Sequence, residues 1–239
     1  VPMGGGKPSA TPELFARYPE SYASMGITAE NVAKKCDVSR EAQDEVAYNS
    51  NIRAAAAVDG GKFDKETFPV TTTVFTDDGP EEVTLTRDEG PRANTTKEGL
   101  AKLRPVFDVK GTVTAGNSSQ VSDGAAAAVM MTVEKAEELG IKPIAIFRKF
   151  EVVGVDPEFM GIGPLPAIQK LWKSAGLTDA DIGTYEINEA FAAQAAYCVR
   201  ELGIDPAKVN PNGGAIALGH PLGGTGAILT AKLLHEMER

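Results

Sequence analysis

The chain has 239 residues, of which 42% are hydrophobic and 24% charged, a composition typical of a folded protein of one large or two small domains rather than a disordered chain. Its formal net charge of −9 argues against nucleic acid as the main partner, and no apolar run reaches the roughly 18 residues that a membrane-spanning helix needs. Two distant cysteines and two histidines exclude a disulfide framework and a His-rich metal site, so we expect a soluble protein of a reducing compartment, without a metal.

The first part of the chain is predicted to be rich in loops, with two helices and one hairpin. The helices are expected at 28–36 and 39–58, where small polar residues stand at the start of each. Runs rich in β-branched residues at 70–75 and 83–86 are separated by 77–80, whose Asp-Asp-Gly-Pro sequence is typical of a turn between paired strands.

From residue 112 onwards the pattern alternates between strands and helices. Strands are expected at 126–131, buried, at 144–155 and at 185–187. Helices are expected at 132–140, 166–176, 190–202 and 227–239, and a helix-start signature lies at 178–181. This alternation predicts an α/β layered architecture with some parallel strands. The chain opens with Val1 in a turn-rich segment, 1–9, and closes in a helix without a stop signal, so both ends are expected to be cut.

Glycine is concentrated in the segment 210–226, where it permits close approach of a backbone to a ligand. The segment has neither the lysine of a phosphate-binding P-loop nor the third glycine of a dinucleotide fingerprint, so both nucleotide motifs are excluded. It does contain His220, between Gly219 and Pro221. A histidine here could be an ordinary loop residue, but a rigid, glycine-lined setting favours a general base or an oxyanion donor.

Asn188 is the second candidate, because it directly follows the expected strand 185–187 and precedes a helix. Ligands in α/β folds bind at this end of the strands. The alternative is that Asn188 only caps the helix and that Glu189 is a first-turn residue favoured by the helix dipole.

Two further segments are weaker candidates. The small polar residues of 116–124 could line a pocket, or form any turn. The segment 87–110 has six basic and four acidic residues, so it could meet an anionic ligand, although a solvated loop is the favoured interpretation.

In this order, three of these blocks resemble signature blocks of the thiolase family. They are Gly-Asn-Ser-Ser-Gln-Val-Ser-Asp-Gly-Ala-Ala at 116–126, Asn-Glu-Ala-Phe at 188–191 and Asn-Gly-Gly-Ala-Ile-Ala-Leu-Gly-His-Pro at 212–221. The segments 25–32 and 153–161 are similar to further family segments. The resemblance covers essentially the whole chain. The sequences of the segments 186–191 and 194–199 are together most similar to those of degradative 3-ketoacyl-CoA thiolases.

The resemblance implies a thiolase-like α/β/α/β/α layered fold that is incomplete and carries a loop domain. Residues 1–121 would form the loop domain that covers the active site and binds CoA, and 122–140 the remainder of the N-terminal half. Residues 141–239 would form the C-terminal half without its last strands. Family members are usually homodimers or homotetramers.

The implied chemistry is a two-step acyl transfer of fatty-acid β-oxidation, with coenzyme A as co-substrate and no tightly bound cofactor. A cysteine thiolate attacks a 3-ketoacyl-CoA, acetyl-CoA leaves, and the acyl group passes to free CoA. His220 is similar to the histidine that activates the nucleophile and helps form an oxyanion hole, and Asn188 to the residue that holds a water there. Six further residues correspond to family positions in the substrate and CoA site. Ser119 is similar to a residue near the pantetheine, and Gly219 belongs to the same site. The residues similar to pocket-lining positions are Met25, Phe107, Met160 and Phe191.

The chain departs from the family pattern at its cysteines. The blocks that carry the family's nucleophilic and second catalytic cysteines have no counterpart here. Cys36 lies on an expected helix without the small residues that surround the nucleophile, and Cys198 is expected to be a packing residue. We therefore expect the 239-residue chain alone to be inactive.

Two alternatives stay open at this point. One is an acetyl-CoA acetyltransferase that makes acetoacetyl-CoA, although Ser24 stands where that branch often has a histidine. The other is a catalytically inert thiolase-fold protein that binds acyl-CoA. Acyl chain length, oligomer size and compartment are left open.

Overall fold

A computed structural model describes residues 10–239 of the chain, and the expected turn-rich segment 1–9 lies outside them. Its N-terminal elements are α1 (Pro12–Arg17), η1 (Pro19–Tyr22), α2 (Met25–Lys35) and α3 (Arg40–Asp59). A hairpin and short helices follow: β1 (Val70–Thr76), β2 (Gly79–Leu85), α4 (Lys97–Ala101), α5 (Val133–Glu138) and η2 (Pro157–Ile162). The C-terminal elements are α6 (Pro164–Ala175), η3 (Asp179–Asp181), α7 (Ala192–Leu202), η4 (Pro206–Lys208), α8 (Ala215–Leu218) and α9 (Thr225–Glu238).

Most predicted helices form within a few residues of their expected bounds, because their end signals act locally. Ser39 caps α3 by accepting the N–H of Ala42 at 3.2 Å, and Thr132 caps α5 by accepting the N–H of Lys135. Gly176 ends α6 in the left-handed conformation, with φ of 67°. The predicted start at 178–181 has the expected capping box but yields only the short 3₁₀ helix η3.

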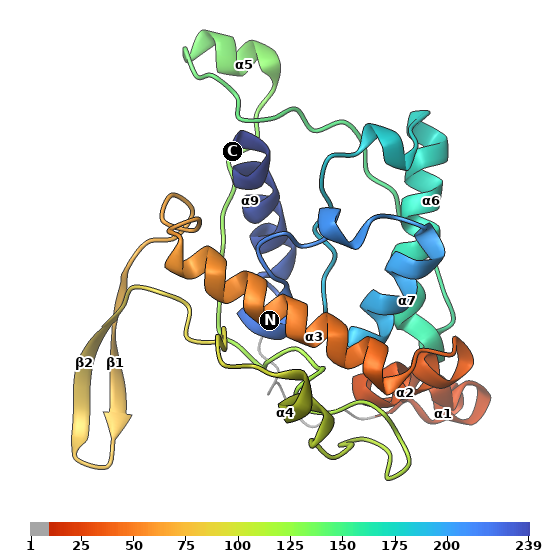
Figure 1. Ribbon diagram of the computed structural model, residues 1–239. Helices are drawn as coiled ribbons and strands as arrows, with labels where there is room; N and C mark the ends of the chain where they lie inside the picture. The colour runs from red at the N-terminus through yellow and green to blue at the C-terminus, as the bar shows by residue number, and fades with distance from the viewer. Residues whose placement is uncertain (1–9) are drawn as a thin grey trace.

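The predicted hairpin is confirmed and projects away from the helices (Figure 1). β1 and β2 are antiparallel, with Val70 opposite Leu85 and Thr76 opposite Gly79. The second strand begins at Gly79, four residues before the predicted start, and includes Pro80. A proline is tolerated there because this two-stranded sheet consists only of edge strands.

The strands predicted at 126–131 and 144–155 are wrong. Both segments run without regular structure on either side of α5, which projects from the other helices (Figure 1), and they are not buried: Val129 is 87% and Phe150 73% exposed. Their apolar composition suits a strand, but a strand forms only when a neighbour pairs with it, and no residue among 10–239 does so.

The strand predicted at 185–187 is reduced to one parallel bridge, between Tyr185 and Val209. The Tyr185 N–H donates to the carbonyl of Lys208 at 2.9 Å, and the Asn210 N–H donates to the carbonyl of Tyr185 at 2.8 Å. The segment is nevertheless buried, and its direction fixes where Asn188 emerges.

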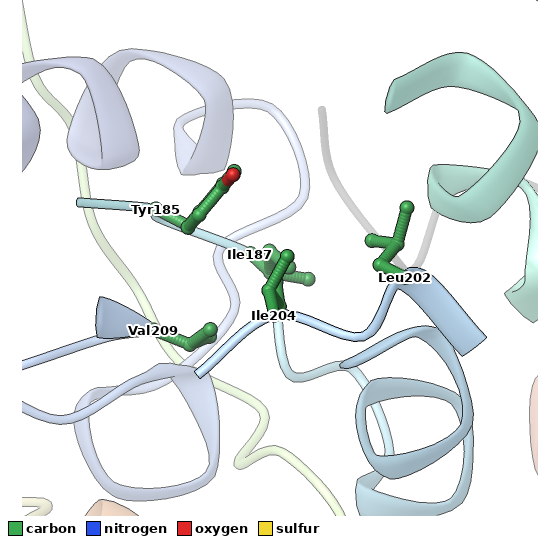
Figure 2. Close-up of a cluster of buried hydrophobic side chains, with 5 residues drawn as sticks. All are labelled: Tyr185, Ile187, Leu202, Ile204 and Val209. Atoms are coloured by element: carbon green, nitrogen blue, oxygen red, sulfur yellow. The ribbon is translucent and has the colours of Figure 1, made fainter. Parts of the chain in front are cut away.

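The core lies in two parts, the first of which includes that segment. One is the apolar cluster of Tyr185, Ile187, Leu202, Ile204 and Val209 (Figure 2), against which α6 packs Leu165, Ile168 and Trp172. The other joins α3, α4, α7 and α8 through Ala47, Leu100, Ala192 and Ile216. The helix α3 crosses α7 (Figure 1), and these contacts hold the loops that precede α7 and α8 against it.

No helix among residues 10–239 has the length and apolarity needed to cross a membrane.

Candidate active site

Asn188 and His220, predicted separately from the sequence, meet in the structure. Nδ2 of Asn188 lies 3.3 Å from Nε2 of His220. Asn188 follows the buried segment ending at Ile187, and His220 follows α8 in the glycine-rich loop. The alternative that Asn188 caps a helix is wrong, because α7 begins at Ala192 with Phe191 as its N-cap residue.

Thr225 fixes the proton arrangement of the His220 ring. We assign the Thr225 hydroxyl as a donor to the carbonyl of Pro221, 2.9 Å away, which makes it the acceptor of a hydrogen on Nδ1 of His220 at 2.7 Å. A hydrogen on Nδ1 leaves a lone pair on Nε2, which accepts from the Asn188 amide. The nitrogen that faces Asn188 is therefore the basic one.

Burial lowers the pKa of His220, because a charged imidazolium is poorly solvated in the half-buried loop. The ring is thus neutral near pH 7 and able to take a proton. Asn188 Oδ1 is buried and has no hydrogen-bond partner within 10–239. Asn188 is also one of the residues that line a small cavity, together with Leu218, Thr225 and Ile228, among others.

The block at 116–124 lies against both of the other blocks. The Ser119 N–H donates to the carbonyl of Ala190 at 2.9 Å, and the His220 N–H donates to the carbonyl of Gln120 at 3.3 Å. Gly219 has φ of 95°, and a side chain there would collide with Ser122. The three blocks singled out in the sequence therefore form one site.

Glu189 holds this site together from beneath and is not a helix first-turn residue. Its buried carboxylate accepts from the Ser50 hydroxyl at 2.6 Å, from Asn210 Nδ2 at 2.9 Å and from the Ile216 N–H at 3.3 Å. Burial raises the pKa of Glu189 despite these donors. A side chain at Gly214 would collide with this carboxylate, so glycine is required where the loop crosses it.

Two of the four predicted pocket-lining side chains touch each other. The rings of Phe107 and Phe191 pack edge to face, with centroids 6.0 Å apart and planes at 81°. Met25 and Met160 lie on α2 and η2, which contact each other, and both side chains remain partly exposed, at 49% and 45%.

Comparison with known proteins identifies the family of the chain. The family described as "Thiolase, N-terminal domain" matches residues 14–134, and "Thiolase, C-terminal domain" matches residues 141–239.

The chain belongs to the thiolase family.

Among curated relatives, the 3-ketoacyl-CoA thiolase of Bacillus subtilis (strain 168) is 55% identical over 244 residues, which cover 100% of this chain and 62% of the relative. The peroxisomal 3-ketoacyl-CoA thiolase of Homo sapiens is 56% identical over 216 residues, 90% of this chain and 51% of the relative. This thiolase chain thus spans between about half and three-fifths of the length of these relatives.

Two solved thiolase-family structures superpose well on the chain. The acetyl-CoA acetyltransferase of Bacillus anthracis gives a TM-score of 0.86 at 46% identity, over 90% of this chain and 54% of that one. The dimeric peroxisomal thiolase of Saccharomyces cerevisiae gives 0.85 at 45% identity, over 96% and 57%. These superpositions confirm the predicted thiolase-like α/β fold, present in part.

Neither cysteine of this thiolase chain hydrogen-bonds to His220. Cys198 is fully buried on α7, and burial raises the pKa of its thiol to about 12, as expected for a packing residue. Cys36 is the C-cap residue of α2, and its carbonyl accepts from Arg200 at 2.6 Å.

Thr225, Gln120 and Glu189 are parts of the site whose roles the sequence analysis missed. Thr225 and Gln120 lie within the glycine-rich and polar blocks, so their positions were marked but their partners were not. The role of Glu189 depends on Ser50, 139 positions away, and no local signal in the sequence indicates that contact.

Proposed function

We propose that the native protein containing this chain cleaves 3-ketoacyl-CoA with coenzyme A to acetyl-CoA and a shortened acyl-CoA, the thiolytic step of β-oxidation. The observation that carries the proposal is the Asn188–His220 pair, with the basic Nε2 of His220 directed at the Asn188 amide. The names of relatives that are 50–56% identical support the same reaction.

In the proposed first step, Nε2 of His220 takes the proton of a cysteine thiol, and the thiolate attacks the 3-keto carbon. The protonated Nε2 and the Asn188 amide then both present N–H groups to the developing oxyanion, directly or through a water. The bond between C2 and C3 breaks, the acetyl-CoA enolate takes a proton, and the acyl group stays on sulfur as a thioester.

In the second step the thiol of free CoA loses its proton to a base and attacks the thioester. The acyl group moves to CoA and the enzyme thiolate is released. Neither Cys36 nor Cys198 is placed to be this thiolate, so we propose that the 239-residue chain by itself binds acyl-CoA without turnover.

Substrate binding is assigned to the residues around the pair. Phe107 and Phe191, with Met25 and Met160, would line the acyl pocket. Ser119 would lie near the pantetheine arm, and Gly219 would belong to the substrate and CoA site. Residues 1–121 would form the CoA-binding loop domain, and 122–140 with 141–239 the two thiolase halves. The native protein would form homodimers or homotetramers and would need CoA only as a co-substrate.

An acetyl-CoA acetyltransferase is the second candidate, favoured by the superposition on the Bacillus anthracis enzyme. The two differ in substrate length. Thiolysis rates of the native protein with acetoacetyl-CoA and with a long-chain 3-ketoacyl-CoA decide between them: we expect efficient cleavage of both, whereas an acetyltransferase would cleave only the first. Binding without any cleavage would instead indicate the inert acyl-CoA-binding protein.

A further inference from the structure

Glu30, on α2, holds a loop whose importance is not evident from the sequence. Its carboxylate is buried, with the residue 9% exposed. Oε1 accepts the Val113 N–H at 2.9 Å, and Oε2 accepts the Thr112 N–H at 2.9 Å. A side chain at Gly111 would collide with this carboxylate, so the loop approaches Glu30 as closely as its backbone allows.

The loop that Glu30 holds carries Phe107. The Val106 N–H donates to the carbonyl of Val113 at 3.0 Å, and Pro105 forms an antiparallel bridge with Thr114. The two arms of the loop are therefore joined, and fixing Val113 also fixes Val106, the residue before Phe107. Phe107 is itself 38% exposed, so packing alone does not immobilise its ring.

The same helix meets the loop a second time. Gly26 lies four residues before Glu30, one turn away on α2. A side chain at Gly26 would overlap the Phe107 ring, which also packs edge to face against Phe191. One face of α2 thus fixes the loop through Glu30 and leaves the space that the ring occupies at Gly26.

We propose that Glu30 is a positioning residue that sets the place of the Phe107 ring against Phe191, and so the width of the acyl-binding pocket. The inference rests on the proposed function, because it takes these rings as the pocket wall. Glu30 does not touch the substrate. Its effect is on which acyl chains fit, not on the proton transfers at His220.

The test is Glu30→Gln in the native protein, because glutamine keeps the size but replaces one of the two accepting oxygens with an NH₂ group, so that one of the Thr112 and Val113 N–H groups loses its acceptor. Amide hydrogen exchange in 105–114 should accelerate by about tenfold or more. The KM for a long-chain 3-ketoacyl-CoA, relative to that for acetoacetyl-CoA, should change by about fivefold, with kcat for acetoacetyl-CoA within about twofold. Glu98→Gln is the matched control, because Glu98 is exposed on α4, and it should change neither the exchange rate of 105–114 nor the KM ratio.

Gly26→Ala perturbs the same ring without removing a polar contact and should change the same KM ratio, which keeps the test valid if Glu30→Gln fails to fold. If the native protein cleaves 3-ketoacyl-CoA but a folded Glu30→Gln variant keeps the same chain-length preference, the role of Glu30 is overturned and the proposed function stands. If Glu30→Gln does not fold, an unchanged preference in Gly26→Ala overturns it in the same way. If the native protein cleaves no 3-ketoacyl-CoA, the proposed function is wrong and the inference about Glu30 falls with it.

Discussion

Nδ2 of Asn188 lies 3.3 Å from Nε2 of His220, although the two residues are 32 positions apart and come from different loops. The contact depends on a third residue, since Thr225 receives the Nδ1 hydrogen and so leaves the lone pair on Nε2. The chemistry proposed for this site needs both features, a basic nitrogen and an adjacent amide donor.

Replacing Thr225 tests the tautomer. Thr225→Val removes the acceptor at Nδ1, so His220 loses the partner that selects its proton position, and we expect kcat for thiolysis to fall by about 10–100-fold with little change in KM. Thr230→Val is the matched control, because Thr230 lies on the same helix and its hydroxyl only donates to the carbonyl of Gly226. Equal rates for the Thr225 variant and the native protein would contradict the arrangement.

The pH dependence of thiolysis follows from the burial of His220. Burial lowers the pKa of its imidazole below the usual 6.5, and the neutral ring is the reactive form. As the pH falls, kcat/KM should therefore decline only below pH 6.5, with its midpoint at the pKa of His220 in the folded protein. A pH profile measured with acetoacetyl-CoA tests this, and an acid midpoint above 6.5 would contradict it.

The sequence was sufficient where structure is determined locally. Ser39 and Thr132 cap their helices, and a turn within the predicted segment 77–80 joins the hairpin, with Asp77 and Asp78 between the paired residues. The strands expected at 126–131 and 144–155 failed, because a strand depends on a neighbour that the pattern cannot supply. Apolar composition indicated the strand type but not the pairing.

For the site, the sequence marked the residues but not what holds them. The glycine-rich segment marked His220, and the position after an expected strand marked Asn188; resemblance to the thiolase family implied their roles, and the structure brings them together. Glu189 and Glu30 act through backbone N–H groups and side chains far away in the chain, so their roles follow from tertiary contacts alone. Both are acidic residues that are buried, a feature that the structure reveals and the sequence does not.

Lys232 is predicted to be essential for stability. Its Nζ lies 2.9 Å from Oε2 of Glu186 and 2.6 Å from the carbonyl of Gly213, and both charged side chains are more than nine-tenths buried. Lys232→Met would leave Glu186 as an uncompensated buried charge, so the free energy of unfolding should fall by about 3–5 kcal/mol.

Chemical denaturation of the unmodified chain and of the Lys232→Met variant measures this loss of unfolding free energy. Lys170→Met, which removes an exposed partner of Glu151, is the control and should have a much smaller effect. Equal midpoints for Lys232→Met and the unmodified chain would show that the buried pair contributes nothing.

Glu66 should destabilise the fold at neutral pH. Its oxygens form no hydrogen bond within the described part of the chain, although a guanidinium nitrogen of Arg239 lies 3.9 Å from Oε1. Burial raises the pKa of the carboxyl in spite of nearby His235, Arg239 and Lys232. The folded state therefore binds a proton at Glu66 more readily than the unfolded state does. The ionised carboxylate lowers the free energy of unfolding at pH 7, and this loss disappears as the pH falls and the carboxyl is protonated. Glu66→Gln should raise the denaturation midpoint at pH 7 and have no such effect below pH 4.5.

The ionised Glu236 carboxylate is expected to stabilise the fold at neutral pH, the opposite of the effect of Glu66, and it serves as the matched control. Burial opposes its ionisation, but hydrogen bonds from Asn212 and Arg239 outweigh that effect and lower the pKa of its carboxyl. Glu236→Gln should therefore destabilise the protein at pH 7, with the loss shrinking as the pH falls through that lowered pKa. Parallel pH dependences for the Glu66 and Glu236 variants would refute this assignment of signs.

The most direct test of the account is thiolysis of a 3-ketoacyl-CoA by the native protein and by its His220→Asn variant, with CoA affinity measured on both. If His220 is the base, kcat should fall by about 10²–10⁴-fold while the Kd for CoA changes little. The second histidine supplies the control, since His235→Gln, on the last turns of α9, should leave kcat unchanged. Unchanged thiolysis kinetics in the His220 variant would contradict the assignment of this site.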